Sequence, residues 1–309
     1  MVYQAIETKS ELTSMGPTWS VSAVIPVYNR SHCIGRAIDS VLAQSFPPRE
    51  ILIVDDGSSD DLPVALARFG NQVRSIRHDT NRGAAAARNT GLRNAAYEFV
   101  AFLDSDDVWK PGKLAKQIEF MQRLGFEASC TGFDIVSPGA NQAHAAWRPY
   151  PEVLTAADFV WGCYTSPGST LLARASILEE CGGYDARFAR YEDWDMLLRL
   201  TAATPRGIGF LREPLSTIHI GSAPSADRCC ASLELLLRSH DSALRAQDPM
   251  LSRRLRSGIA FNRASAFAHD GRWWAACREL GHAFLLSPTG NWPFQVVLSE
   301  RLQAKRRGE

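Results

Sequence analysis

The chain has 309 residues, of which 45% are hydrophobic and 22% charged, and 34 basic against 33 acidic side chains give a formal net charge of +1. This balance is that of an ordinary globular protein, and it excludes collagen-like, disordered and disulfide-scaffold proteins. Residues 1–227 carry 21 basic and 26 acidic side chains and residues 228–309 carry 13 and 7, so the acidic first part argues against nucleic acid as the main partner.

Strand and helix patterns alternate over the first hundred residues. Apolar runs typical of strands that are buried on both faces occur at 21–27, 51–56, 73–79 and 99–104. Helical patterns lie between them at 31–44, 60–69 and 83–96, with Ser31 as the cap of the first and Ser58 or Asp60 as the cap of the second. The alternation implies right-handed crossovers and an α/β fold with a mainly parallel sheet, which binds ligands at the carboxyl ends of its strands.

The elements beyond residue 110 are more mixed. We expect a helix at 110–125, a strand near 127–136, a strand at 169–173, helices at 176–183 and 192–202, and a hairpin or two short strands at 208–220. Strand patterns then stop, and helices are expected at 228–247, 250–269, 272–286 and near 293–304. This divides the chain into an N-terminal extension (1–19), an α/β domain (20–227) and an all-helical C-terminal region (228–309).

The segment DSDD, Asp104 to Asp107, directly follows the fourth apolar run. Two carboxylates that are one residue apart at a strand end project into the same space, where they can hold a hard divalent cation that in turn binds phosphate oxygens. A solvated acidic turn is the alternative, and the DxD spacing alone does not decide between the two.

Other polar segments also end strands of the predicted sheet. In VIPVYN (24–29), Pro26 would remove a ladder donor from a central strand, so we expect the chain to leave the sheet there and form a ligand rim. Tyr28 would stack on a flat ring or pack in the core. A carboxylate of VDDGSSDD (54–61) can accept hydrogen bonds from a base or a ribose, as acidic residues do at nucleotide sites.

Two segments at helix starts complete the set of candidate site residues. In NRGAAAARNTG (81–91), a glycine allows close backbone approach and two arginines can face a diphosphate or a base. In YEDWD (191–195), Glu192 and Asp193 favour the helix dipole, and one of them can instead serve as a general base in the same cleft.

Taken together, these motifs resemble those of the family 2 glycosyltransferases of GT-A fold. The resemblance covers about residues 20–220 and runs through VIPVYNR, ILIVDDGSSDD, NRGAAAARNTGL, FLDSDDVWKPGKL, GGYD and YEDWDMLLRL, in the order of the family. It implies a Rossmann-like GT-A catalytic domain that transfers a sugar from a nucleoside-diphosphate sugar, with UDP-sugars favoured, to a hydroxyl of a glycan, lipid-linked or other acceptor. The reaction would invert the anomeric carbon with the help of Mn²⁺ or Mg²⁺.

The resemblance also assigns roles to single residues. The nucleotide-sugar would be bound by Pro26, Tyr28, Asn29, Asp55, Asp56, Arg82, Gly83, Arg88, Asp104 and Ser105, with Asp55 on the base and Asp56 on the ribose side. The metal ligands would be Asp104, Asp106 and His219. Asp193, with Glu192 beside it, would be the general base. Lys113 would fix the loop after the DxD pair, and the segment 168–170 would approach the donor sugar.

The C-terminal region adds expectations about partners and location. Small residues, Gly271 and Pro288 within 256–288 are typical of a tetratricopeptide-like hairpin, which must pack on the catalytic domain or on another copy of the chain in a homo-oligomer. The basic tail after residue 291 is either a docked helix or a contact with an anionic membrane surface. No apolar run reaches about 18 residues, no signal-peptide core is visible, and neither a disulfide framework nor a zinc site is indicated by the seven cysteines. We therefore expect a cytoplasmic enzyme, peripheral at the inner face of the membrane if the tail binds lipid.

Two other functions fit parts of the sequence. FLDSDDV matches the DxDx[TV] pattern of haloacid-dehalogenase-type phosphohydrolases, but that interpretation leaves VIPVYN and VDDGSSDD without a role. A protein that kept the fold and the nucleotide-sugar site but lost turnover is the other alternative, although the acids at 104, 106 and 193 are intact.

Overall fold

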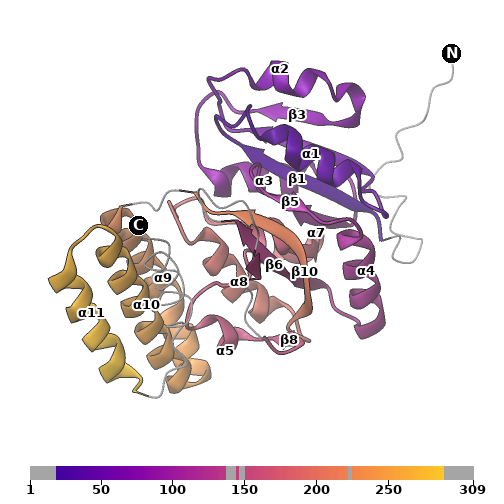
Figure 1. The fold of residues 1–309 in the computed structure, drawn as a ribbon. Helices are drawn as coiled ribbons and strands as arrows, with labels where there is room; N and C mark the ends of the chain where they lie inside the picture. Colours follow the sequence, from indigo (N-terminus) through magenta and orange to yellow (C-terminus); the bar gives the residue numbers. More distant parts are fainter. Residues whose placement is uncertain (1–18, 137–143, 146–149, 222–224, 289–309) are drawn as a thin grey trace, which may run out of the picture.

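The computed structural model of the protein describes residues 19–136, 144–145, 150–221 and 225–288. Its main body is one mixed sheet in the strand order β3-β2-β1-β4-β9-β6-β10-β5, with β7 paired to β6 and β8 paired to β10. The strands are β1 Val21–Val27, β2 Glu50–Asp55, β3 Arg74–Arg77, β4 Phe99–Phe102, β5 Val108–Trp109, β6 Ala128–Val136, β7 His144–Ala145, β8 Val153–Leu154, β9 Leu172–Arg174 and β10 Ile208–His219. Figure 1 shows helices on both faces of this sheet and the C-terminal helices beside it.

The first four strands pair in parallel, as the alternating pattern predicts. Their connections are the helices α1 Ile34–Leu42, α2 Leu62–Ala67 with the short 3-10 helix Gly70–Gln72, and α3 Ala84–Asn94. Alternate residues of β1 enter opposite cores: Ile25 packs in the core with α1 and α4, and Val24 packs in the core with α3 and α8. Because β1, β2 and β4 run parallel to one another, their carboxyl ends lie at the same edge of the sheet.

The second half of the sheet is mixed. Its helices are α4 Lys113–Leu124, α5 Ala156–Phe159, α6 Pro167–Thr170, α7 Ala175–Glu180 and α8 Glu192–Ala203. The expected hairpin at 208–220 is wrong, because β10 is one long strand whose register with β6 shifts on either side of Pro214. These irregularities let a strand pass a residue that has no N–H to donate. The strand expected at 169–173 begins only at Leu172, after the short helix α6.

The expected helix caps are also wrong. Cys33 precedes α1 and Asp61 precedes α2, and neither side chain makes a cap hydrogen bond. Instead, the N–H of Ser31 donates to the Asp60 carboxylate at 2.7 Å. The two polar loops that follow β1 and β2 thus bond to each other, which fixes the rim of the sheet.

The C-terminal helices α9 Ala226–Gln247, α10 Pro249–His269 and α11 Trp273–Leu286 confirm the all-helical appendage. Leucines of α9 and α10 share the hydrophobic core of α8, and Nε2 of His240 lies 2.8 Å from Oδ1 of Asp195 in α8. A Cβ on Gly258 would lie 2.5 Å from the carbonyl oxygen of Val160, so α10 approaches the α5 segment closely. The helical region therefore packs on the α/β domain, while its tetratricopeptide likeness and the boundary near 227 stay predictions.

Some expectations fall on residues outside the described ranges. They are the helix near 293–304, the basic tail and nearly all of the N-terminal extension. Within the described ranges, no helix combines the length and the apolar character needed to cross a membrane.

One buried cation makes the fold sensitive to pH. Lys113, at the start of α4, is fully buried, and its Nζ donates to Oε1 of Gln117 (2.8 Å) and lies 4.4 Å from the centre of the Trp109 ring. No carboxylate in the described part of the chain pairs with it. Burial lowers the pKa of Lys113 to about 7, while an unfolded lysine keeps a pKa near ~10.4.

We predict that Lys113→Met changes the pH dependence of stability. Above pH 7 the unfolded wild type binds one more proton than the folded form, so its free energy of unfolding rises with pH and the variant lacks this gain. The wild type should gain about 2 kcal/mol over Lys113→Met between pH 7 and pH 9, measured by urea unfolding at both pH values. If the difference in free energy of unfolding between the two proteins does not change with pH, Lys113 is charged in the folded protein and the prediction is wrong.

Candidate functional site

A cleft of about 810 Å³ opens at the carboxyl ends of β1 and β4. The turn after β1, the DSDD loop after β4, the starts of α3 and α8, and the end of β10 contribute to its walls. It is lined by Pro26, Val27, Tyr28, Arg30, Asp56, Asn81, Gly83, Ala84, Ala87, Arg88, Asp104, Ser105, Asp106, Asp107, Ala189, Arg190, Glu192, Ile218, His219 and Arg228. Most of the site residues predicted from the sequence therefore meet in one place.

Pro26 reaches the cleft without leaving the sheet. Pairing of β1 with β2 continues to Val27, whereas pairing with β4 ends at Val24. Since Val24 accepts from Leu103 on the β4 side, Pro26 faces the same side, where no partner strand needs an N–H. The expectation that the chain leaves the sheet at Pro26 is therefore correct for its pairing with β4 and wrong for its pairing with β2. Tyr28 is 45% exposed at the cleft, so the alternative of a core tyrosine is wrong.

Three predicted donor-site residues do not line the cleft. The Oδ1 of Asn29 accepts from the N–H of Ser59 at 2.8 Å, and Asn29 itself lies in the left-handed region, with φ 51°. The buried Asp55 accepts from the N–H of Ser58 (2.8 Å) and pairs with Arg77. Arg82 is exposed outside the cleft.

Asp56 shapes the cleft through hydrogen bonds to the loop before α3. Its Oδ1 and Oδ2 accept from the backbone N–H groups of Arg82 (2.9 Å) and Gly83 (2.7 Å). On its other side, Nδ1 of the buried His78 lies 2.7 Å from Oδ1. The carboxylate is thus fully engaged in placing Gly83, whose φ of 90° is in a region that favours glycine.

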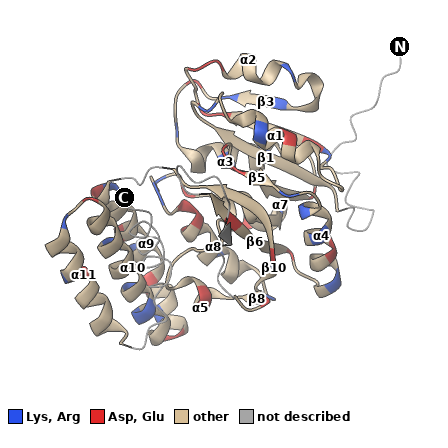
Figure 2. Ribbon diagram, in the orientation of Figure 1, with Lys and Arg blue, Asp and Glu red and all other residues tan. Residues whose placement is uncertain are grey.

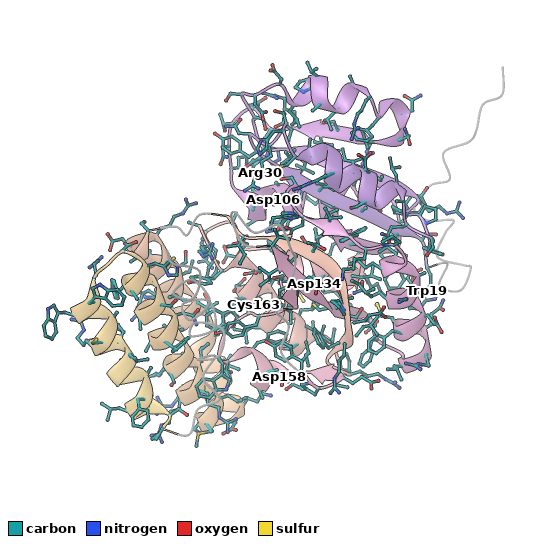
Figure 3. The ribbon with its side chains drawn as sticks, viewed as in Figure 1. Trp19, Arg30, Asp106, Asp134, Asp158 and Cys163 are labelled. Carbon is teal, nitrogen blue, oxygen red and sulfur yellow. The ribbon has the colours of Figure 1, made fainter. Side chains whose placement is uncertain are left out.

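Each acid of the DxD pair faces an arginine. Asp106 pairs with Arg30, and Figure 3 shows these two side chains next to each other at the end of β1. Oδ1 of Asp104 accepts from Arg88 at 2.6 Å. Both carboxylates are therefore neutralised by cations of the chain itself.

Arg88 joins the DxD loop to the start of α8. It is almost completely buried, and its second terminal nitrogen donates to Oε1 of Glu192 at 2.9 Å. Nearby Asp104 and Glu192 raise the pKa of Arg88 despite its burial. A Cβ on Gly168 would lie 2.5 Å from Oδ2 of Asp104 and 2.9 Å from Arg88, so the segment 168–170 packs against this bridge.

Asp107, the last acid of DSDD, holds the far wall. It accepts from the hydroxyl of Ser169 (2.5 Å) and from the backbone N–H of His219 (2.8 Å). Burial, together with the charge of Asp104, raises the pKa of Asp107. Burial lowers the pKa of His219, so its imidazole is neutral near pH 7, and its Nδ1 has no hydrogen-bond partner in the described structure.

The donor set fits a cation that is shared with a phosphate ligand. Among the described residues, no three His, Cys, Asp or Glu side chains converge as a ready metal cage. Asp106 and His219 nevertheless line the same cleft, with Asp104 beside them, although the unpartnered Nδ1 of His219 is buried 3.9 Å from Oδ1 of Asp107. Mg²⁺ in particular is commonly bound by one or two carboxylates that are completed by substrate phosphates.

A second cavity of about 260 Å³ adjoins the cleft on the other side of the Arg88 bridge. Its wall includes Asp193, whose Oδ1 accepts from the N–H of Trp194 at 2.8 Å. Oδ2 lies 3.7 Å from Sγ of Cys163, a thiol that burial keeps protonated by raising its pKa. Burial, together with the charge of Glu192, raises the pKa of Asp193 to about 6. Asp193 is therefore a carboxylate suited to accept a proton.

Sequence analysis missed several residues that build the site. Arg30 lies in the VIPVYNR motif and Asp107 in the DSDD motif, so their place in these motifs could have identified them as site residues. Arg228 of α9 lines the main cleft and Asn262 of α10 lines the second cavity. No local motif marks these two residues, because only the packing of the C-terminal helices brings them to the site.

Comparisons with known proteins identify a family and several similar chains. The family model described as "Glycosyl transferase family 2" matches residues 22–182, just over half of the chain. The amylovoran biosynthesis glycosyltransferase AmsB of Erwinia amylovora is 27% identical over 305 residues, which cover 94% of this chain and 99% of that protein. The Escherichia coli enzyme WfgD, a UDP-Glc:alpha-D-GlcNAc-diphosphoundecaprenol beta-1,3-glucosyltransferase, is 37% identical over 118 residues, 38% of this chain and 47% of WfgD. In four of the relatives, the matched part spans only 19% to 60% of the relative's length.

Solved structures share the fold. TarS from S. aureus has a TM-score of 0.65 at 19% identity, with 85% of this chain and 80% of that chain covered. The mannosyltransferase PcManGT from Pyrobaculum calidifontis, solved with GDP-Man and Mn²⁺, has a TM-score of 0.57 at 19% identity, with 93% and 81% covered. These likenesses confirm the predicted GT-A fold.

We predict that Arg88→Met destabilises the protein because it leaves Asp104 and Glu192 without their shared cation. The free energy of unfolding, measured with urea, should fall by about 2 kcal/mol or more. The fall should be smaller than the ~3–5 kcal/mol that results from breaking a fully buried pair, because Asp104 is partly exposed. Arg68→Met, which breaks an exposed pair with Asp39, is the control and should cost less than about 1 kcal/mol. Adding Glu192→Gln to Arg88→Met should recover part of the loss. Equal losses in the two single arginine variants would contradict the bridging role.

Proposed function

The chain belongs to glycosyl transferase family 2, and from this premise we propose that it transfers a sugar from a nucleoside-diphosphate sugar, with a UDP-sugar favoured, to an acceptor hydroxyl with inversion at the anomeric carbon. The observation that carries the proposal is the pair of adjoining cavities. The larger contains the DxD acids, the smaller contains a carboxylate of raised pKa, and the Arg88 bridge lies between them. Such an arrangement suits a donor in one cavity and an acceptor hydroxyl in the other.

The donor would occupy the larger cleft. The exposed ring of Tyr28 is available to stack on the base, and Ser105 and Gly83 line the path of the ribose and the diphosphate. Asp56 acts through the Gly83 loop that it holds. TarS has been solved with UDP and with UDP-GlcNAc, which supports a uridine nucleotide as the first donor to test.

Mn²⁺ or Mg²⁺ is the proposed cofactor, held by Asp106 and His219 with Asp104 beside them. When bound, the cation neutralises negative charge on the diphosphate that leaves. Arg30 and Arg88 orient the two acids, and Arg88 in addition keeps Asp104 in register with the start of α8. Asp107 fixes the backbone of His219.

Asp193 is the proposed general base. A hydroxyl is a poor nucleophile at neutral pH, and proton removal by a positioned base contributes about 10²- to 10⁴-fold to the rate. Its raised pKa makes the carboxylate basic enough for the task while leaving it mostly ionised at pH 7. Glu192, which is committed to Arg88, tunes this pKa by its charge and does not take the proton itself.

A lipid-linked glycan is the acceptor class that the relatives favour. The name of WfgD gives a diphosphoundecaprenol-linked sugar as its acceptor, and AmsB is named for the biosynthesis of amylovoran. Neither alternative function gains support from the site. A scaffold without turnover has no need of a basic Asp193, and a phosphohydrolase with its nucleophile at Asp104 leaves the second cavity and Asp193 without a role.

The donor assignment is tested by thermal shift with a panel of nucleotide-sugars. A UDP-sugar together with Mn²⁺ should raise the melting temperature, since a ligand that binds only the folded state stabilises it. Asp106→Asn should abolish the metal-dependent part of the shift, whereas Asp39→Asn, on the exposed side of α1, should leave it unchanged. If no nucleotide-sugar stabilises the wild type, the proposed function is wrong.

The general base is tested by the pH dependence of transfer. Because the base must be ionised, kcat/KM should fall about tenfold per pH unit below pH ~6. Glu192→Gln removes the neighbouring negative charge, so the acid limb should move to lower pH. Asp193→Asn should keep donor binding and lower kcat by about 10²- to 10⁴-fold. Normal transfer by Asp193→Asn would refute the assignment.

A further inference from the structure

The end of the edge strand β3 supports the acids at the end of β2. Parallel pairing sets Arg77 opposite Asp55, and the N–H of His78 donates to the carbonyl of Asp55 at 2.8 Å. Figure 2 shows the basic residues of β3 in blue at this edge of the sheet. The register brings the imidazole of His78 beside the carboxylate of Asp56, the acid that holds the loop before α3.

The contacts of His78 determine its tautomer. Its Nδ1 lies 2.7 Å from Oδ1 of Asp56, and its Nε2 lies 2.9 Å from Oγ1 of Thr90. An unprotonated Nδ1 would turn a lone pair toward a carboxylate, so Nδ1 carries the proton and donates to Asp56. Nε2 of the neutral ring then accepts from the hydroxyl of Thr90, which itself accepts from Arg93 at 3.1 Å. The imidazole is therefore bonded at both nitrogens, and it is buried together with Asp56 and Thr90.

Both bonds of His78 lead to α3, the helix that begins at the larger cleft. Asp56 accepts from two backbone N–H groups directly before the helix, and Thr90 lies within it. The N-cap of α3 is Gly83, which has no side chain to bond, and the first turn contains no acid. The contact from Asp56 is therefore what fixes the start of the helix. His78 ties α3 to the sheet edge at two points, on either side of Arg88.

His78 itself lines neither of the two reaction cavities. It can act on a ligand only through the residues that it holds in place. Those of the α3 segment that line the larger cleft are Gly83, Ala84, Ala87 and Arg88. We propose that His78 is a positioning residue for the nucleotide-sugar, an inference that rests on the proposed function. Its Nδ1–H keeps Asp56, and with it the start of α3, in the conformation that binds the donor.

The test compares two amide substitutions, because each reproduces one ring nitrogen. The side-chain nitrogen of His78→Asn takes the place of Nδ1 and can donate to Asp56, whereas that of His78→Gln takes the place of Nε2 and reaches Thr90. Isothermal titration calorimetry measures the binding of UDP with Mn²⁺ by the full-length protein. His78→Asn should bind UDP within about threefold of the wild type, and His78→Gln should bind at least about tenfold more weakly, because a buried charged acceptor has lost its donor.

His240→Asn is the matched control. Nε2 of the buried His240 lies 2.8 Å from Oδ1 of the buried Asp195, and neither residue lines the two reaction cavities. The substitution breaks a similar bond of similar burial away from the donor. The melting temperature should fall, while the Kd for UDP should stay within about threefold of the wild type. This control separates positioning of the donor from a general loss of stability.

Hydrogen exchange of the ligand-free protein, measured by mass spectrometry, reports on the loop itself. Peptides that contain Arg82 and Gly83 should exchange at least about tenfold faster in His78→Gln than in His78→Asn. Equal UDP affinity of the two His78 variants, or binding by His78→Asn that is more than about tenfold weaker than that of the wild type, overturns the role of His78. If the wild type does not bind UDP, the proposed donor is wrong, and the exchange comparison alone decides whether His78 holds the loop.

Discussion

The site depends on one buried guanidinium. Arg88 lies in α3, a helix that the first crossovers of the sheet place under the cleft, and it donates to acids that follow it by 16 and 104 residues. A lysine would supply the charge but not the two separate donors of the planar fork. One rigid guanidinium contacts both Asp104 of the DxD pair and Glu192. Because the proposed base Asp193 is the next residue after Glu192, the dimensions of an arginine side chain set the distance between the DxD pair and the base. Residue 168 must be a glycine, because a Cβ there would clash with Asp104 and Arg88.

A second constraint is the large number of acids at one sheet edge. Asp55, Asp56, Asp104, Asp106, Asp107, Glu192 and Asp193 all follow strands or begin helices around the same rim. Within the described structure most have their own partner: arginines for Asp55, Asp104, Asp106 and Glu192, backbone N–H groups for Asp56, and a hydroxyl for Asp107. Asp193 receives only a thiol and the neighbouring N–H, and burial and the charge of Glu192 raise its pKa. The proposed proton transfer is thereby assigned to the acid whose charge is compensated least.

The sequence predicted the parallel half of the fold and half of the residues that line the cleft, because local patterns control both. Apolar runs define β1, β2 and β4, and polar residues directly after a parallel strand must meet at its carboxyl edge. Prediction failed where pairing between distant segments decides the outcome. The sequence pattern predicts two strands at 208–220 because Pro214 interrupts it. In the structure β10 is one strand, because shifts in its register with β6 accommodate Pro214. Asn29 and Asp55, both predicted to contact the donor, do not line the cleft: Asn29 accepts from the N–H of Ser59 in the loop after β2, and Asp55 accepts from the nearby Ser58 and pairs with Arg77.

The position of Arg228 and Asn262 changes how the chain can be divided. Both residues belong to helices that follow the last strand, and Arg228 lines the larger cavity of the proposed site while Asn262 lines the smaller one. A boundary near residue 227 is therefore a border of secondary structure and not of the proposed site. Recombination between homologues at that border would join a donor pocket to a foreign lining, so the two segments are expected to be inherited together.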